Sequence, residues 1–331
     1  GIAVDGIDGL ATATLENNSV RSESSLGAIL VSRLGEATLT ENRVEPGSAL
    51  ALDAVQVGAL TVERCALVGE TTTARLGAAT DAAIAGSYLA GGAEHGVRAA
   101  GPGGALELTG SVVTGCGRGI TVEEASAVLE GNAIGANASF GVRAKGASAL
   151  ALRDNELVSN ASSGIDLVSL AGGADATYTI EGNLVMESVG LAVSARSCGD
   201  GLIDLVDNDL IATVPGAVTN AGVTGELGDG VGVLTGTDGV ASRARFAGNL
   251  IHGNIRLGVI VHGAGASATL EGNDFGEGNG YGRALDGVVD EQPNLLLQSG
   301  GGADGSDAPL AQTVEGVFVN DDPAAAGPAP L

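Results

Sequence analysis

Apolar and polar positions along this chain follow a short pattern that returns many times. The pattern has the form apolar-x-apolar-x-x-Asn-x-apolar, and one polar position, here called the anchor, can be followed from copy to copy. Successive anchors are 21 to 25 residues apart, apart from two wider gaps of 28 and 41 residues. The anchors are Asn18, Asn42, Cys65, Ser87, Ser111, Asn132, Asn155, Asn183, Asn208, Asn249 and Asn273.

Three columns of apolar residues accompany the anchors. The positions five before, three before and two after the anchor are apolar in every copy, as Ala127, Leu129 and Ile134 show around Asn132. A second apolar segment follows most anchors by eight to ten residues and alternates with period two, as in GVRAAG, GITV and GVRAKG. Alternation over such short segments is typical of β-strands, and no segment has the length and period of a helix.

Each repeat is too small to bury its apolar residues alone, so we expect the repeats to stack as coils of one solenoid. Stacking at about 4.8 Å pairs each strand with its neighbour and aligns equivalent side chains. The predicted fold is all-β, a single-stranded parallel β-helix of about 11 coils with an asparagine ladder that satisfies buried polar groups. The predicted ladder residues are Asn18, Asn42, Asn132, Asn155, Asn183, Asn208, Asn249 and Asn273.

The repeat also predicts the organisation of the chain. Residues 1–290 are expected to form the β-helix, residues 291–320 a C-terminal cap or loop region, and residues 321–331 a disordered tail or linker. The two wide spacings place insertions around Leu170–Ala176 and within Ala212–Asp229. Loops on a rigid scaffold often carry function, although solenoids also tolerate neutral insertions.

Charge and composition exclude several classes of partner. The net charge is −25, with 15 Lys and Arg against 40 Asp and Glu, so we expect no binding to nucleic acid. No apolar run approaches the roughly 20 residues of a membrane span. The three cysteines are too few for a disulfide framework. The chain opens at Gly1 without Met, and we expect a mature or excised form that is secreted or at the cell surface.

The repeat resembles that of the pectin-lyase-like superfamily over about residues 10 to 290. The resemblance implies a right-handed β-helix but no particular activity, because the superfamily includes lyases, hydrolases, epimerases, adhesins and non-enzymatic proteins. Its lyases use clustered carboxylates to hold calcium, with an arginine as base, and its hydrolases use paired aspartates. The coils here contain no Asp-Asp pair, no Gly-His-Gly and no Arg-x-Lys element, and the Asp-Pro-His-Glu element of alginate epimerases is also missing.

One acidic patch is the candidate calcium or ligand site. Asp204 alternates with Ile203 and Leu205 and should point outward. Acidic residues of adjacent coils would join it, and such a patch could supply some of the six to eight oxygens that calcium needs. The alternative is a solvated acidic face. The patch comprises Asp154, Glu156, Glu181, Asp204, Asp207 and Asp209.

Weaker candidates have simpler structural interpretations. Glu130, Arg153 and Glu181 would stack as a charge ladder on consecutive coils, and the segment Gly300–Asp307 has a faint likeness to a calcium-binding nonapeptide. The histidines, including His95, are isolated in the sequence, and we expect them in turns or at the surface.

The sequence therefore favours a non-catalytic extracellular or cell-envelope protein that acts as a rigid scaffold, adhesin or glycan-binding module. Its expected partner is a polysaccharide or cell-surface glycan, calcium is the one cofactor considered, and we expect a monomer. The alternative is a divergent polysaccharide lyase, epimerase or hydrolase acting on uronic-acid-containing polymers, although aromatic platforms for sugars are scarce at 2 % of residues.

Overall fold

The computed structural model describes residues 1–6, 11–23, 27–214, 216–220, 223–255, 257–276, 279, 295–298, 300–307 and 311–314. The chain divides into two compact units, Gly1–Glu156 (unit 1) and Leu157–Leu331 (unit 2). Across these ranges the secondary structure is β-strand, with no helix. The described residues accordingly include no helix long and apolar enough to cross a membrane.

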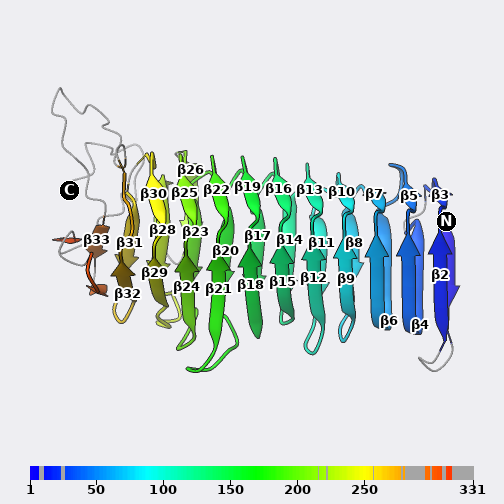
Figure 1. Ribbon diagram of the computed structural model, residues 1–331, viewed down its shortest axis with the longest axis horizontal. Helices are drawn as coiled ribbons and strands as arrows, with labels where there is room; N and C mark the ends of the chain where they lie inside the picture. Colours follow the sequence, from blue (N-terminus) through cyan, green and yellow to red (C-terminus); the bar gives the residue numbers. More distant parts are fainter. Residues whose placement is uncertain are drawn as a thin grey trace. The chain divides into compact units, whose positions relative to one another are not determined.

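Each coil of unit 1 contributes to three rows of parallel strands (Figure 1). Row A precedes the anchor, row B follows it and row C closes the coil; β4 (Ile29–Thr40) and β6 (Leu50–Glu63) are long enough to run through rows C and A. Row A also contains β2 (Thr12–Glu16), β9 (Asp81–Ala85), β12 (Ala105–Thr109), β15 (Ser126–Glu130) and β18 (Ala149–Arg153). Row B contains β3 (Ser19–Val20), β5 (Arg43–Val44), β7 (Ala66–Val68), β10 (Tyr88–Ala90), β13 (Val112–Thr114) and β16 (Ala133–Gly135). Row C also contains β1 (Ile2–Asp5), β8 (Thr72–Leu76), β11 (His95–Ala100), β14 (Arg118–Glu123) and β17 (Val142–Lys145). A further short strand, β19 (Glu156–Val158), begins at the last residue of the unit.

Unit 2 repeats this arrangement. Row A contains β21 (Thr177–Glu181), β24 (Leu202–Val206), β29 (Arg243–Ala247), β32 (Ser267–Glu271) and β34 (Gly302–Asp304). Row B contains β22 (Leu184–Met186), β25 (Asp209–Ile211) and β30 (Leu250–His252). Row C contains β20 (Ile165–Val168), β23 (Leu191–Arg196), β28 (Asp229–Leu234), β31 (Val259–His262), β33 (Leu295–Gln298) and β35 (Ala311–Val314).

Two regions of unit 2 depart from the simple repeat. The predicted insertion Ala212–Asp229 contains an antiparallel hairpin of β26 (Gly216–Asn220) and β27 (Val223–Leu227). Beyond residue 290, β33 pairs in parallel with β31, β34 with β32 and β35 with β33. Parallel pairing therefore continues into the region predicted as cap or loop, while the predicted tail at 321–331 lies outside the described residues.

The predicted apolar columns form the core of each unit. In unit 1, Leu108, Leu129 and Leu152 are register neighbours on three successive strands and have no exposed surface. Outward residues such as Val128 alternate with them and are exposed. In unit 2 the fully buried Tyr178 and Phe246 occupy the same kind of inward position. The inward register predicted from the sequence is confirmed.

The anchor turn has one backbone conformation throughout. The residue before every anchor has a positive φ, between 50° and 66°, whether it is Gly, Asn, Glu, Arg or Asp. Glycine adopts this conformation at no steric cost, which explains its frequency there. The turn buries the anchor side chain between coils, where its polar atoms must find partners.

Those partners are the neighbouring anchors. In unit 1, Nδ2 of Asn18 donates to Oδ1 of Asn42 at 2.8 Å, and Nδ2 of Asn132 donates to Oδ1 of Asn155 at 2.9 Å. Between these pairs the small anchors keep the stack continuous, since the backbone N–H of Cys65 donates to Oγ of Ser87. In unit 2, Asn183, Asn208, Asn249 and Asn273 form a stack with Nδ2–Oδ1 distances of 2.9 Å. The predicted asparagine ladder and the all-β parallel β-helix are confirmed.

A second polar stack, not predicted from the sequence, lies five or six residues after the anchors. In unit 1 the backbone N–H of Cys116 donates to Oδ1 of Asn137 at 3.0 Å. In unit 2, Oγ1 of Thr213 donates to Oδ1 of Asn254 at 2.9 Å, and Nδ2 of Asn254 donates to Oδ1 of Asn279 at 3.0 Å. The nearly constant offset from the anchors could have revealed this column in the sequence. It was missed because several positions of the column hold small residues instead of asparagine.

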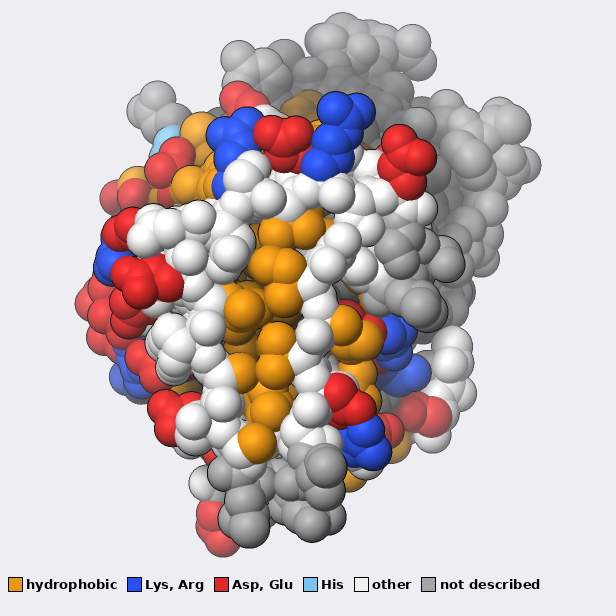
Figure 2. All heavy atoms as spheres, turned by 90° about the vertical axis from the view of Figure 1, so that its right-hand side faces the viewer, with side chains coloured by type: hydrophobic (Ala, Val, Ile, Leu, Met, Phe, Trp, Pro, Cys, Tyr) orange, Lys and Arg blue, Asp and Glu red, His pale blue; other side chains and the backbone are white. Residues whose placement is uncertain are grey.

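The first coil of unit 1 leaves the ends of the apolar columns uncovered. Figure 2 shows a stripe of hydrophobic side chains on this face. The inward residues Val4 and Leu15 are only partly buried, whereas their register neighbours Val31 and Leu39 on β4 are completely buried. The stripe is thus a cross-section of the core.

Candidate functional site

The six carboxylates of the predicted acidic patch are divided between the two units. Asp154 and Glu156 flank the anchor turn at the end of unit 1, and both are exposed. In unit 2, Glu181 is exposed at the end of β21, while Asp207 and Asp209 lie on either side of Asn208.

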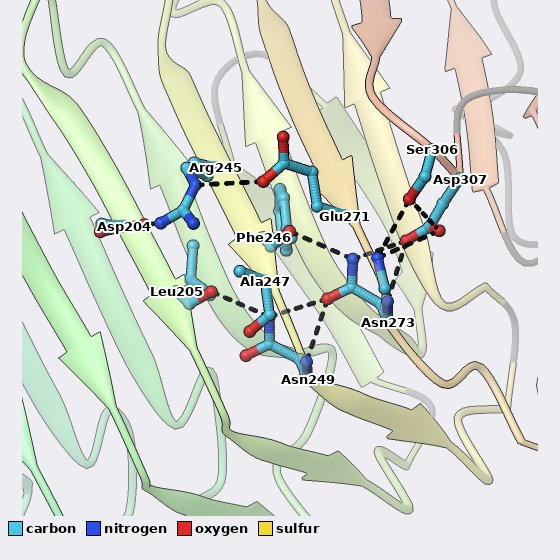
Figure 3. Close-up of polar contacts among 11 residues, drawn as sticks. Asp204, Leu205, Arg245, Phe246, Ala247, Asn249, Glu271, Asn273, Ser306 and Asp307 are labelled. Carbon is cyan, nitrogen blue, oxygen red and sulfur yellow. Dashed lines mark hydrogen bonds and ion pairs between the residues drawn. The ribbon is translucent and has the colours of Figure 1, made fainter.

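Asp204 points outward from β24, as predicted, between the buried Ile203 and Leu205. Its Oδ1 accepts a hydrogen bond at 2.9 Å from Nη1 of Arg245 on the next strand, β29. Arg245 also lies 3.6 Å from a carboxylate oxygen of Glu271 (Figure 3). The central carboxylate of the predicted patch is therefore neutralised by an arginine.

The described parts of the chain contain no cluster of potential metal ligands. No group of three or more His, Cys, Asp or Glu side chains among these residues is arranged to hold a metal ion. Glu130 and Arg153 are register neighbours on β15 and β18, which is the placement expected of a charge ladder. In the segment Gly300–Asp307, Asp304 is exposed and Asp307 accepts a hydrogen bond from the last anchor, Asn273.

The outer face of row C in unit 1 brings together cationic side chains that sequence analysis had not connected. Arg75 on β8 is in register with Arg98 on β11. Arg98 is in register with Thr121 on β14, and Thr121 with Arg143 on β17. Residues in register on parallel strands share one face and lie about 4.8 Å apart per strand. We call Arg75, Arg98, Arg118, Arg143 and Lys145 the basic strip.

Two carboxylates balance part of this charge. Nε of Arg75 donates to Oδ1 of Asp53 at 2.8 Å, and Nη2 of Arg98 donates to Oε2 of Glu123 at 2.7 Å. Within the described residues, Arg118 and Lys145 form no ion pair within 4.0 Å. Among these residues, the positive charges of Arg118 and Lys145 are therefore not offset by an ion pair, on a chain whose net charge is −25.

His95 lies in the middle of the strip. It was expected in a turn or at the surface, and this is wrong: it belongs to β11 and is only 6 % exposed. Its Nδ1 is 2.9 Å from Oγ1 of Thr121 on the next strand. Burial lowers the pKa of His95, and the neighbouring Arg118 and Arg98 lower it further against the opposing effect of Glu123 and Glu94, which favours the neutral imidazole.

An aromatic ring borders the same face. The guanidinium of Arg143 lies over the ring of Phe140, 5.0 Å from its centre, and Phe140 is partly exposed. An arginine stacked on an aromatic ring is attracted to the face of the ring by a cation–π interaction. This pair places an apolar ring beside a cationic group at the border of the strip.

The basic strip had a signal in the sequence. Arg75, Arg98 and Arg143 follow their anchors by ten or eleven residues, and all three precede an apolar residue of the second strand. The alternation of these strands was recognised, but the polar residues between the apolar ones were not compared across coils. Only such a comparison places them on one face.

The corresponding face of unit 2 is different. Asp166 on β20 is in register with Ser194 on β23, and Ser194 with Gly232 on β28. Nη2 of Arg196 lies 3.2 Å from Oδ2 of the buried Asp166. A row of arginines is therefore a feature of unit 1 and not of the repeat as such.

Comparisons with known proteins agree with this architecture. Residues 60–210 match the family profile described as "Right handed beta helix region". Two solved structures of single-substitution mutants of the periplasmic alginate epimerase AlgG resemble the chain, each at 12 % identity. The first gives a TM-score of 0.34, with 93 % of this chain and 73 % of that chain covered; the second gives 0.32, with 92 % and 72 %. No curated protein sequence matches the chain. The right-handed parallel β-helix recognised from the repeat is confirmed.

Proposed function

We propose that this protein is a non-catalytic, glycan-binding β-helix of the cell envelope or extracellular space, and that the basic strip of unit 1 binds an anionic polysaccharide. The observation that carries the proposal is the alignment of Arg75, Arg98 and Arg143 on one face of successive strands. A monomeric state and a secreted or cell-surface location belong to the same proposal.

The strip suits a repeating anion because it is itself periodic. Arginines recur along the row at intervals of one or two strands, so one extended polymer can meet several of them at once. Guanidinium groups bind carboxylates and sulfates through paired hydrogen bonds, which are stronger than hydrogen bonds between neutral groups. The partly exposed ring of Phe140 adds an apolar surface for a sugar face.

The ion pairs within the strip do not block such a ligand. Arg98 and Glu123 are 39 % and 34 % exposed, and exposed pairs contribute at most about 1 kcal/mol. A polymer carboxylate can take the place of Glu123 at small cost. Because the attraction between the strip and an anionic polymer is electrostatic, binding should weaken as salt screens it.

Binding to a panel of soluble polymers tests the proposal. Alginate, polygalacturonate and heparin represent anionic polymers, and dextran is the neutral control, with affinity measured by isothermal titration calorimetry. We expect an anionic polymer to bind, and Arg98→Gln and Arg118→Gln each to weaken binding by about tenfold, as expected for loss of a hydrogen bond between charged groups. Arg43→Gln, in row B and 69 % exposed, is the matched control and should bind like the unaltered protein.

A polysaccharide lyase or epimerase is the second candidate, favoured by the neutral imidazole of His95 beside Arg98 and Arg118. A neutral base near cations that hold a uronate carboxylate could remove a proton, but His95 is only 6 % exposed. Release of unsaturated uronides, followed by absorbance, separates the two functions. We expect none with or without calcium; turnover that is lost in His95→Ala would establish the enzyme.

A further inference from the structure

The asparagine ladder of unit 2 ends on a carboxylate. After Asn249 and Asn273, the position of the next anchor is taken by Asp307, which follows β34 (Figure 3). Oδ2 of Asp307 accepts hydrogen bonds from the backbone N–H of Asn273 and from its Nδ2, each at 2.9 Å. These are the same two donors that each asparagine of the stack presents to the Oδ1 of the next.

The second carboxylate oxygen is also occupied. Oδ1 of Asp307 accepts from the backbone N–H of Gly272 at 3.2 Å and from the hydroxyl of Ser306 at 2.9 Å. The backbone N–H of Asp307 donates to the carbonyl oxygen of Leu270 at 3.2 Å. Beyond the parallel pairing of β34 with β32, the side chain of Asp307 therefore fastens the end of the segment Gly300–Asp307 to the turn after β32.

The chemistry of the ladder explains why the end member is an acid. Each asparagine accepts from the coil before it and donates to the coil after it, so the stack has a direction. An ionised carboxylate accepts only and leaves no N–H group in need of a further acceptor. It also receives four donors at once, which an amide with a single acceptor oxygen cannot do.

We infer that Asp307 is an acid-sensitive clasp that closes the last coil of unit 2 at neutral pH and releases the segment Gly300–Asp307 when its carboxylate is protonated. Protonation would convert one acceptor oxygen into an O–H donor that faces other donors. The contacts on both oxygens are weakened together, because they converge on one group.

The pKa of Asp307 has the direction that this role requires. Burial acts to raise it, but the hydrogen bonds from Asn273, Ser306 and Gly272 prevail and lower the pKa below its ordinary 3.8. A carboxyl group whose pKa is lower in the folded state contributes stability above its ordinary pKa and loses it as the pH falls through the folded value. The clasp is therefore closed at neutral pH and opens only as the pH falls through the folded pKa, which lies below 3.8.

The acidic side chains on the elements next to the clasp either have other partners or are exposed. On β32, Glu271 lies against Arg245, and after the anchor turn a carboxylate oxygen of Asp274 accepts from the backbone N–H of Gly276 at 2.8 Å. On β34, Asp304 is exposed. Among the described residues, no charged side chain forms a hydrogen bond or ion pair with Asp307.

Hydrogen exchange of the full chain, read by mass spectrometry, tests the clasp. Asp307→Asn is compared with the unaltered protein at the same pH, so that the intrinsic pH dependence of exchange cancels. At pH 7 we expect faster exchange in Asp307→Asn, on the order of tenfold, confined to peptides covering Gly272–Asn273 and Gly300–Asp307, as loss of a charge-assisted hydrogen bond predicts. In a second measurement well below pH 3.8 the two proteins should exchange alike once the carboxyl group of Asp307 is protonated.

Two further variants keep the test decisive. Asp304→Asn removes an exposed acid from the same segment and should match the unaltered protein at both pH values. Gly305→Ala should loosen the segment at both pH values, since a Cβ at Gly305 would lie 2.2 Å from the carbonyl oxygen of Leu270. Equal exchange in Asp307→Asn and the unaltered protein at pH 7, with Gly305→Ala loosened, would overturn the proposal.

Discussion

Nδ2 of Asn132 donates to Oδ1 of Asn155 at 2.9 Å, and the backbone N–H of Asn132 donates to the same oxygen at 3.1 Å. Nδ2 of Asn155 in turn donates to the carbonyl oxygen of Leu129 at 2.8 Å. One buried amide thus joins the strand end and the turn of the preceding coil. The ladder is a set of such junctions, and its contribution to stability can be measured at a single residue.

Asn155→Ala should lower the free energy of unfolding by roughly 1–3 kcal/mol, because two buried N–H groups of Asn132 and one carbonyl lose their partner. Urea denaturation followed by circular dichroism measures the change. Ser148→Ala, at an exposed position of the same coil, is the control and should change little. Equal stability of Asn155→Ala and the unaltered protein would mean that water replaces the amide without cost.

Leu152→Asp should be far more damaging. Leu152 has no exposed surface and is in register with the equally buried Leu129, so an aspartate there would be an isolated charge in a dry column at a cost of several kcal/mol. Val128→Asp, at a position 38 % exposed on the outer face of row A, is the matched control. Thermal melting of both variants tests the register, and an unchanged melting curve for Leu152→Asp would refute it.

Calcium should leave the melting temperature of the protein unchanged, and a chelator should do the same. The physical reason is the ion pair between Asp204 and Arg245, which occupies the carboxylate at the centre of the predicted acidic patch. Differential scanning calorimetry with and without calcium provides the measurement. A rise in melting temperature that disappears in Asp204→Ala would instead establish a calcium site on this face.

The pKa of Asp5 should depend on Arg33. Hydrogen bonds from the guanidinium of Arg33 and the hydroxyl of Ser32 lower the pKa of Asp5 to about 2. Because the folded pKa is the lower one, the stabilisation from this contact is present above the ordinary pKa of 3.8 and is lost as the pH falls through about 2. In Arg33→Gln, the carboxyl carbon of Asp5 should titrate closer to 3.8 by NMR. If Asp5 titrates at the same pH in Arg33→Gln as in the unaltered protein, the two side chains do not meet in solution.

The three cysteines should resist alkylation in the native state. Cys65, Cys116 and Cys198 are free and buried, and burial raises the pKa of Cys198 to about 12. Since the thiolate is the reacting species, iodoacetamide at roughly pH 8 should label none of them until urea is added. Mass spectrometry counts the labels, and rapid native labelling at any of the three would contradict its buried position.

The candidate site was less predictable than the fold, and the reason can be seen in particular residues. Asp204 was correctly placed on the outer face, because alternation between Ile203 and Leu205 is a local property. Its partner Arg245 lies 41 positions away across the widest gap in the repeat, so no local pattern joins them. His95 was misplaced for a similar reason, since its hydrogen-bond partner Thr121 belongs to the next coil.

By itself, the sequence determined the coil: which residues point inward, where the anchor turn falls and which amides stack. These follow from period-two alternation and from one turn conformation repeated along the chain. Only the tertiary structure decided which outward side chains meet, since that depends on register between strands and on the reach of each side chain. Stacking set Arg75, Arg98 and Arg143 on one face, paired Asp204 with Arg245, and brought Asp307 to the end of the ladder. Which side chains meet on the surface depends on how neighbouring coils are aligned, whereas the sequence of a single coil already decides which of its residues point into the core.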